Sequence, residues 1–179
     1  DVRRARRHGE ALAAITVPLP LGADPTAIAA ASRRRGEAWF SFEQADRDRF
    51  ALAGLGCVAA IDERGPDRFA AAARRWRALA ERAACDDPDG PRGSGPVAVG
   101  GFAFASDGGG APHWAGYEPA SLHVPEAAMA RRGDEVLLTL AALARPDDVP
   151  DEIVARLEAR AAELHERPLP LLDPDPAGR

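Results

Sequence analysis

Lysine is absent from the 179-residue sequence, and all 23 of its basic residues are arginine. Chemistry that needs a lysine base or a lysine Schiff base is therefore excluded from this set of residues. Cysteine is scarce as well, because Cys57 and Cys85 are too few for a disulfide framework and lack the spacing of a metal site. Cys57 lies in an apolar run and is predicted to be a small buried residue. A reducing cytoplasm is the expected location.

Long apolar runs are also missing. No segment approaches the roughly 20 apolar residues that a membrane-spanning helix needs. The formal net charge of −5 argues against a nucleic-acid partner, since such proteins usually carry a basic face. Residues 1–10 are charged and precede a weakly apolar, proline-containing segment, which does not resemble a signal peptide. We therefore predict a solvated lead-in there, and a soluble chain that binds neither membrane nor nucleic acid.

Hydrophobic periodicity and breaker residues predict an α+β fold, in which helices flank an antiparallel sheet. Extended segments are expected at 11–21, 38–43, 50–61, 97–104, 122–130 and 135–143, and helices at 25–35, 66–84 and 148–164. Two prolines make 11–21 an edge strand, and Gly54 and Gly56 suggest a bulge or close backbone approach in 50–61. Short connections make neighbouring strands antiparallel. Residues 1–167 should form the folded region, and the Pro-rich residues 168–179 a linker or frayed tail.

The helix boundaries follow from capping residues. Asp24 and Pro25 suit an N-cap and a first helical position. Gly36 suits the stop, which places Arg33–Arg35 in the last turn, where positive charge favours the helix dipole. Asp148 is predicted to cap the last helix. The buried faces should comprise Phe69, Ala72, Ala73, Trp76, Leu79, Ala80 and Ala83 in one helix, and Ile153, Val154, Leu157, Ala161 and Leu164 in the other.

Two loops partly resemble ligand-binding motifs. The loop with Asp87, Asp89 and Gly90 would need a bidentate acid at the position of Pro96 to form a calcium site. The glycines at 108–110 are not followed by the Lys-Ser/Thr of a phosphate loop, so we interpret them as a flexible segment. Neither loop is predicted to hold a ligand.

The side chains that could do nucleophilic or metal chemistry are scattered. The four histidines are His8, His113, His123 and His165, and none pairs at the spacing of a helical metal site. His123 lies in a predicted strand and is expected to be a satisfied structural residue. Ser41 and Ser121 lack the context of a nucleophile elbow. From the residues alone, no catalytic, cofactor-binding or metal site is predicted.

Three segments carry a resemblance to a known family. They are Trp39-Phe40-Ser41-Phe42-Glu43-Gln44 with Phe50-Ala51-Leu52-Ala53-Gly54-Leu55-Gly56, then Gly95-Pro96-Val97-Ala98-Val99-Gly100-Gly101-Phe102-Ala103-Phe104, then Trp114, Pro119, Leu122-His123-Val124-Pro125 and an Arg-Gly turn into Val136-Leu137-Leu138-Thr139. In order and spacing these segments resemble the N-terminal half of isochorismate synthases, members of the chorismate-utilising enzymes. The Leu-Leu-Glu-Ser-like segment of the related anthranilate and aminodeoxychorismate synthases is not found, which favours the isochorismate branch.

The resemblance implies a Mg²⁺-dependent parent enzyme that moves a hydroxyl from C4 to C2 of chorismate. In that family a lysine activates the attacking water, a glutamate is the general acid and further glutamates hold the metal, which offsets the substrate carboxylate. The resemblance places all of these residues in the C-terminal half, beyond Arg179. No catalytic, cofactor-binding or metal residue is therefore assigned to this chain, and no cofactor is expected in it.

The resemblance also suggests roles for motif residues inside the chain. Gly100 and Gly101 should allow close packing, while Phe102, Phe104 and Trp114 should fill the core. Glu43 is the one charged motif residue, and a buried, hydrogen-bonded carboxylate is favoured for it over a role near substrate.

Two hypotheses for the function follow. In the first, the chain is an inactive N-terminal fragment of an isochorismate synthase of menaquinone, siderophore or salicylate biosynthesis. It would then self-associate through surface that the missing half normally covers. In the second, it is a stand-alone module that binds a ligand or partner on a remnant of the same fold.

Overall fold

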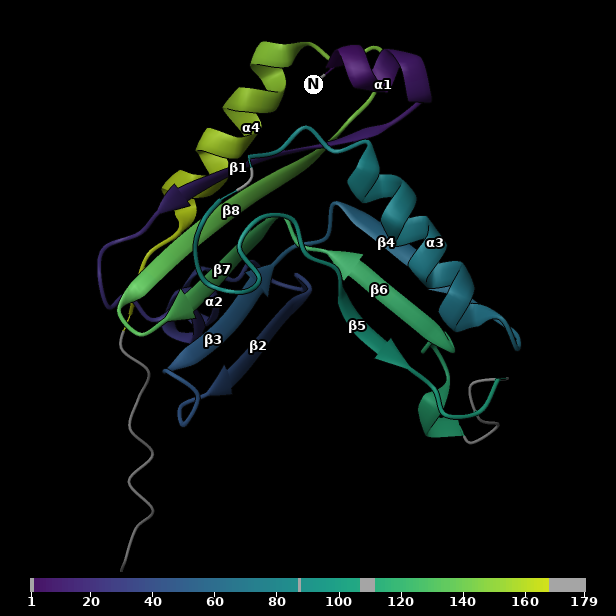
Figure 1. Cartoon of the computed structure of the whole chain (residues 1–179), viewed down its shortest axis with the longest axis horizontal. Helices are drawn as coiled ribbons and strands as arrows, with labels where there is room; N and C mark the ends of the chain where they lie inside the picture. Colours follow the sequence, from purple (N-terminus) through teal and green to yellow (C-terminus); the bar gives the residue numbers. More distant parts are fainter. Residues whose placement is uncertain (1, 87, 107–111, 168–179) are drawn as a thin grey trace, which may run out of the picture.

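The structure is a computed structural model that describes residues 2–86, 88–106 and 112–167, and it contains two antiparallel sheets with helices packed around them (Figure 1). The elements are α1 (Val2–His8), β1 (Ala11–Pro18), α2 (Pro25–Ser32), β2 (Trp39–Gln44), β3 (Phe50–Leu55), β4 (Ala59–Glu63), α3 (Arg68–Glu81), β5 (Val99–Phe102), the 3₁₀ turn η1 (Pro112–Trp114), β6 (Ala120–Val124), β7 (Ala127–Arg132), β8 (Glu135–Ala144) and α4 (Pro150–Glu163). The larger sheet has the order β1-β8-β7-β3-β2, and the smaller has the order β4-β6-β5. The pairings between these strands are antiparallel, which confirms the predicted α+β class. Asp87, the glycines at 108–110 and the predicted tail at 168–179 lie outside the described residues.

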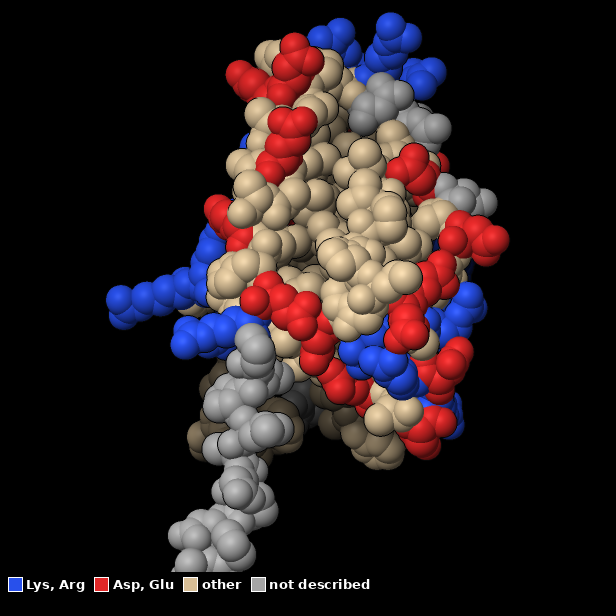
Figure 2. Space-filling model, turned by 90° about the vertical axis from the view of Figure 1, so that its left-hand side faces the viewer, with Lys and Arg blue, Asp and Glu red and all other residues tan. Residues whose placement is uncertain are grey.

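β1 forms one edge of the larger sheet and pairs only with β8 in it, as the prolines near its end predicted. Figure 2 shows the side of the molecule on which β1 and α4 lie. A broad area without charged side chains occupies the middle of this side, and carboxylates and arginines gather at its borders. The exposed Ile15 and Leu21 belong to this edge and the turn that follows it.

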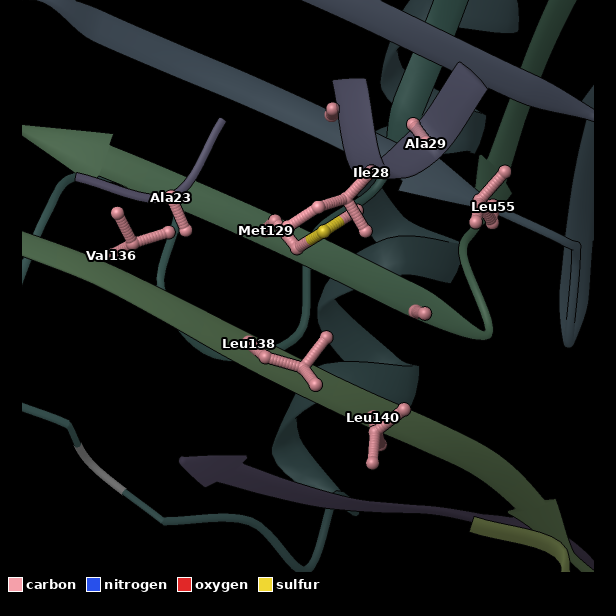
Figure 3. Packing of buried hydrophobic residues seen from close by; sticks show 10 residues of the cluster. Ala23, Ile28, Ala29, Leu55, Met129, Val136, Leu138 and Leu140 are labelled. Carbon is pink, nitrogen blue, oxygen red and sulfur yellow. The ribbon is translucent and has the colours of Figure 1, made fainter. Parts of the chain in front are cut away.

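The main core lies between one face of the larger sheet and the helices α2 and α4. Alternate residues of β8, namely Val136, Leu138 and Leu140, point into this layer because side chains of a strand alternate between faces. They pack with Met129 of β7 and Ile28 of α2, and these side chains converge in Figure 3. Burial of this apolar layer fixes the register of the central strands.

The predicted apolar strand 50–61 is two strands in different sheets, and so is the predicted strand 122–130. β3 ends at Leu55, and β4 begins at Ala59 after Gly56, whose φ is +74°. At the same corner Glu126 separates β6 from β7 and its N–H donates to Leu55 O at 2.9 Å. The β3–β4 and β6–β7 connections therefore pass between the two sheets at the same corner. Hydrophobic periodicity cannot predict this corner, because it depends on contacts between distant segments.

Of the two predicted N-caps, one is present and one is not. Asp24 caps α2 as predicted, since its Oδ1 accepts from Thr26 N at 2.9 Å. Asp148 does not cap α4: the N-cap position is Val149, and the Asp148 carboxylate instead accepts from Arg145 N at 2.9 Å. A turn bond to the preceding loop has therefore replaced the predicted cap.

The arginine triplet lies beyond α2 and not in its last turn, which corrects the prediction. α2 ends at Ser32, and Arg33 already has extended dihedral angles. The Arg33 guanidinium lies 5.1 Å from the centroid of the Trp39 ring, a cation–π contact with the first residue of β2. Arg34 follows Arg33 and forms ion pairs with Glu126 and Glu163.

The predicted solvated lead-in is the helix α1. Val2 and Ala5 are buried against Ala11 of β1 and Ile153 of α4. A seven-residue helix is unstable by itself, and its packing on two distant elements supplies the stability that local sequence lacks. Within the described residues no helix combines the length and the apolar character needed to cross a membrane.

The amphipathic helices are present, but their buried faces differ in part from prediction. In α3, Ala72 is buried and Trp76 and Leu79 pack on a cluster around Leu12, whereas Phe69 is half exposed. In α4, Ile153 is buried but Val154 is exposed, and Arg160 has no exposed side-chain area at all. The prediction that Cys57 is buried is wrong as well, because it lies at the exposed corner between the sheets.

Candidate functional site

An apolar hollow with aromatic walls lies at the end of the smaller sheet. Its volume is about 480 Å³, within the range of ligand sites and small docking grooves. β5 and the segment after it supply Gly101, Phe102, Ala103, Phe104 and Ala105, and the opposite wall comprises Trp114, Tyr117, Glu118 and Ser121. We call these nine residues the aromatic pocket.

The aromatic side chains of this pocket face outward. Phe104 is fully exposed, and Tyr117, Trp114 and Phe102 are exposed by 72%, 52% and 43%. Sequence reasoning placed Phe102, Phe104 and Trp114 in the core, and the structure shows that this is wrong. Phe69 of α3 stacks on Phe102 but leaves it partly exposed, and no described residue covers Phe104. Hydrophobicity identifies these residues as apolar, but it could not show whether the fold buries them.

A buried cation fixes the backbone at the rim of the pocket. Arg68, at the start of α3, is only 4% exposed. Its Nη2 donates to Ala103 O at 2.7 Å and to Phe104 O at 3.1 Å, and its Nη1 donates to Gly65 O at 3.2 Å. The guanidinium also lies 4.3 Å from the centroid of the Phe69 ring, which stacks on Phe102 at 4.8 Å. The exit of β5 is thus held by charge-assisted hydrogen bonds.

The two glycines of β5 differ in what surrounds them. A Cβ at Gly100 would lie 1.9 Å from Ser121 O on β6, which confirms close packing at this position. At Gly101, in contrast, no atom of a described residue lies within 4 Å of a Cβ, so the prediction of close packing is wrong within this part of the chain. Gly101 therefore opens onto the aromatic pocket.

Sequence reasoning missed three contributors to this region. Tyr117, Glu118 and Arg68 were assigned no role, although Glu118 forms a 2.5 Å ion pair with Arg64 at the rim. For Tyr117 and Glu118 the sequence did offer a signal, because the motif residue Trp114 lies only a few positions before them. Burial of Arg68 had no signal, because an arginine in the first turn of an amphipathic helix is ordinarily solvated.

Glu43 lies away from the aromatic pocket, on the side of β2 that faces α2. Thr26 Oγ1 donates to its carboxylate and lies 2.6 Å from Ser41 Oγ. The predicted hydrogen bonding is therefore present, but the carboxylate is exposed and not buried. β2 is an edge strand, so this polar group meets solvent where a central strand would have covered it.

His123 lies in β6, and its Nε2 is buried without a hydrogen-bond partner in the structure. The prediction of a satisfied structural histidine is thus wrong for this nitrogen. Burial lowers the pKa of His123 below its ordinary value, because the charged imidazolium is poorly solvated there. The ring meets Phe40 edge to face, with centroids 6.3 Å apart. These contacts favour a neutral ring in the folded protein.

We expect the stability of the protein to fall on mild acidification because of His123. The unfolded chain binds the proton more tightly than the folded chain, so stability declines as the pH drops below about 6.5, the ordinary pKa of histidine. His123→Phe should reduce this loss between pH 7 and pH 5.5, measured by urea unfolding. His113→Phe, at an exposed position, is the matched control and should keep the original slope. An unchanged slope in His123→Phe would contradict the assignment.

Metal and thiol chemistry have little support in the described residues. No group of three His, Cys, Asp or Glu side chains there is arranged to hold a metal ion. Cys57 and Cys85 are both free and exposed. Partial burial raises the pKa of the Cys57 thiol, which disfavours the reactive thiolate.

Comparison with solved structures identifies the class of fold. The chain superposes on MenF, the menaquinone-specific isochorismate synthase from Escherichia coli, with a TM-score of 0.54 and 17% sequence identity. The match covers 94% of this chain and 34% of the MenF chain, so this chain spans about a third of that protein's length. The two antiparallel sheets and their flanking helices therefore share the fold of the matched part of MenF.

The family is shown by sequence. The model of the family described as chorismate binding enzyme matches residues 2–177, and the chain belongs to this family. The predicted family is thereby confirmed. Comparison with curated protein sequences finds no match.

Proposed function

We propose that this chain is the N-terminal part of an isochorismate synthase, in which it forms one structural layer and contributes no catalytic residue. The observation that carries the proposal is the family match over nearly the whole chain, combined with coverage of only a third of MenF. The parent enzyme would isomerise chorismate to isochorismate by moving a hydroxyl group.

The residues present here do not fit the catalytic requirements of that reaction. The resemblance implies a lysine base, and the sequence has no lysine. It also implies Mg²⁺, whose hard oxygen ligands would have to be clustered carboxylates, and no cluster of three possible ligands occurs in the described residues. The base and the metal site would then belong to polypeptide outside this chain, and we assign no step of the reaction to its residues.

The chain by itself should therefore not convert chorismate. We expect no isochorismate above the uncatalysed background when the 179-residue chain is incubated with chorismate and Mg²⁺ and the products are separated by chromatography. The intact product of the gene should have a mass well above 18.9 kDa and should show Mg²⁺-dependent turnover in the same assay. Turnover by the short chain would contradict the proposal, and so would an inactive longer product.

A stand-alone binding module is the second candidate, and the aromatic pocket is the observation that favours it. Its volume of about 480 Å³ and its aromatic walls could hold a small apolar ring. An intact gene product of 18.9 kDa would support this alternative over the first.

A further inference from the structure

We infer that the aromatic pocket is a docking surface for the polypeptide that completes the chorismate-binding fold, and that this polypeptide packs directly over Gly101. The inference rests on the proposed function and names the surface and the occupant. It is carried by the environment of Gly101, the exposure of the aromatic side chains and the open edge of β5.

Gly101 is the most informative of these features. Its φ lies outside the left-handed region, so the backbone does not require glycine there. A Cβ would meet no described atom within 4 Å, so packing among the described residues does not require glycine either. Glycine weakens a strand and often marks a place where another backbone approaches closely. The approaching group is therefore one that this part of the chain does not supply.

The aromatic side chains beside Gly101 form an exposed apolar patch. Phe104 projects fully into solvent although Arg68 fixes its backbone carbonyl, so its outward direction is built into the fold. Phe102, Trp114 and Tyr117 add further exposed aromatic area around the same hollow. A monomeric protein rarely leaves such an apolar patch open to water. Aromatic residues of this kind are typical anchors of buried interfaces.

The shape of the site favours a polypeptide over a small ligand. Among the described residues, β5 pairs only with β6 in the smaller sheet, so its other edge is open there to an added strand, which could satisfy the backbone groups of that edge. About two thirds of the MenF chain lies outside the matched region, which supplies a candidate of sufficient length. The occupant should therefore be an extended, apolar segment that aligns with the β5 edge and seats side chains among the aromatic rings.

The first test uses thiol labelling of the intact gene product. With Cys57 and Cys85 replaced by serine, Phe104→Cys reports on the aromatic pocket, and Val154→Cys on α4 is the control because Val154 is 51% exposed. We expect the Phe104→Cys thiol to react at least about tenfold more slowly in the folded than in the urea-unfolded protein, since reaction needs local opening. The Val154→Cys thiol should react at similar rates in both states.

The outcomes separate the inference from the proposed function. A long gene product in which Phe104→Cys labels as fast as Val154→Cys would overturn the inference and leave the proposed function standing. Protection of Val154→Cys alone would place the covering polypeptide on α4 and would also overturn the inference. A gene product of only 18.9 kDa would overturn both, and concentration-dependent protection of Phe104→Cys in it would assign the surface to a second copy of the chain.

The second test uses the glycine pair of β5. At an uncovered strand position, Gly101→Val should be neutral or stabilising, because valine favours strands. If a backbone packs over Gly101, the same variant should lower the melting temperature of the intact protein by several degrees. Gly100→Ala is the positive control, since its Cβ would collide with the backbone of Ser121. An unchanged or raised melting temperature in Gly101→Val would contradict the inference.

Discussion

Replacing Arg160 by methionine should lower the free energy of unfolding by about 3–5 kcal/mol, the usual loss when one partner of a buried ion pair is removed. The Arg160 side chain has no exposed area, and its Nη2 lies 2.6 Å from Glu37 Oε1, itself only 8% exposed. Its Nε lies 3.1 Å from Glu126 Oε2, and its Nη1 lies 2.8 Å from Glu163 Oε2. Without the guanidinium, the buried Glu37 carboxylate loses the cation that pairs with it, whereas Glu126 keeps its ion pair with Arg34 at 3.3 Å.

The positions of the residues that pair with Arg160, here called the Arg160 network, explain the size of the expected loss of stability. Arg160 comes from α4, Glu37 precedes β2, and Glu126 lies at the corner where the chain passes between the sheets. Gly56 stands at the same corner, where a Cβ would lie 2.8 Å from the Glu126 Cβ. A single cation therefore joins three segments that are far apart in the sequence.

Urea unfolding of Arg160→Met and of a matched control would measure the effect. Arg156→Met removes an exposed arginine of the same helix, which pairs with Asp148 at 3.5 Å, and should cost less than about 1 kcal/mol. Both substitutions preserve helix propensity. The double variant Arg160→Met, Glu37→Gln should recover part of the loss, because it removes one uncompensated carboxylate. Equal losses for Arg160→Met and Arg156→Met would show that the buried network does not stabilise the fold.

Truncating Met129 to alanine should destabilise the fold by about 2–5 kcal/mol, the range for large-to-small substitutions in a core. Met129 has no exposed area and lies in β7, a central strand of the larger sheet. It contacts the layer formed by α2 and β8, so its loss leaves a cavity that neighbouring strands cannot fill without breaking their register.

Leu21→Ala provides the comparison for Met129→Ala. Leu21 is 83% exposed, so its truncation should change the stability by no more than about 0.5 kcal/mol. Thermal and urea unfolding of the two variants should therefore differ strongly, although each loses a side chain of similar size. A loss below about 1 kcal/mol in Met129→Ala would mean that the two faces of the larger sheet have been assigned the wrong way round.

The order and type of the elements could be predicted from the sequence wherever the determinants are local. The Asp24 carboxylate caps α2 through the two N–H groups that follow it, and the β7–β8 hairpin turns at Gly133 with φ of +59°. The resemblance to chorismate-utilising enzymes was also available from short motifs, since it depends on residue order along the chain. The α+β class and the family both followed from such short-range signals.

Other features depend on contacts between distant segments, and local sequence could not predict them. Periodicity joined β3 to β4 in one strand because it cannot detect a corner at which the chain changes sheets. It did not place Arg160 on the buried face of α4, because two of the carboxylates that pair with it, Glu37 and Glu126, come from distant segments of the chain. It also overlooked α1, whose stability comes from packing on β1 and α4.

The aromatic pocket shows the division most clearly. The sequence by itself determined that Phe102, Phe104 and Trp114 are apolar residues that require burial, that lysine is missing and that the chain belongs with chorismate-utilising enzymes. Only the tertiary structure decided that these aromatic side chains lie on an outer face beside the open edge of β5. The physical reason is that hydrophobicity makes burial of a side chain favourable. Whether the side chain is buried depends on which other segments pack against it in the folded protein.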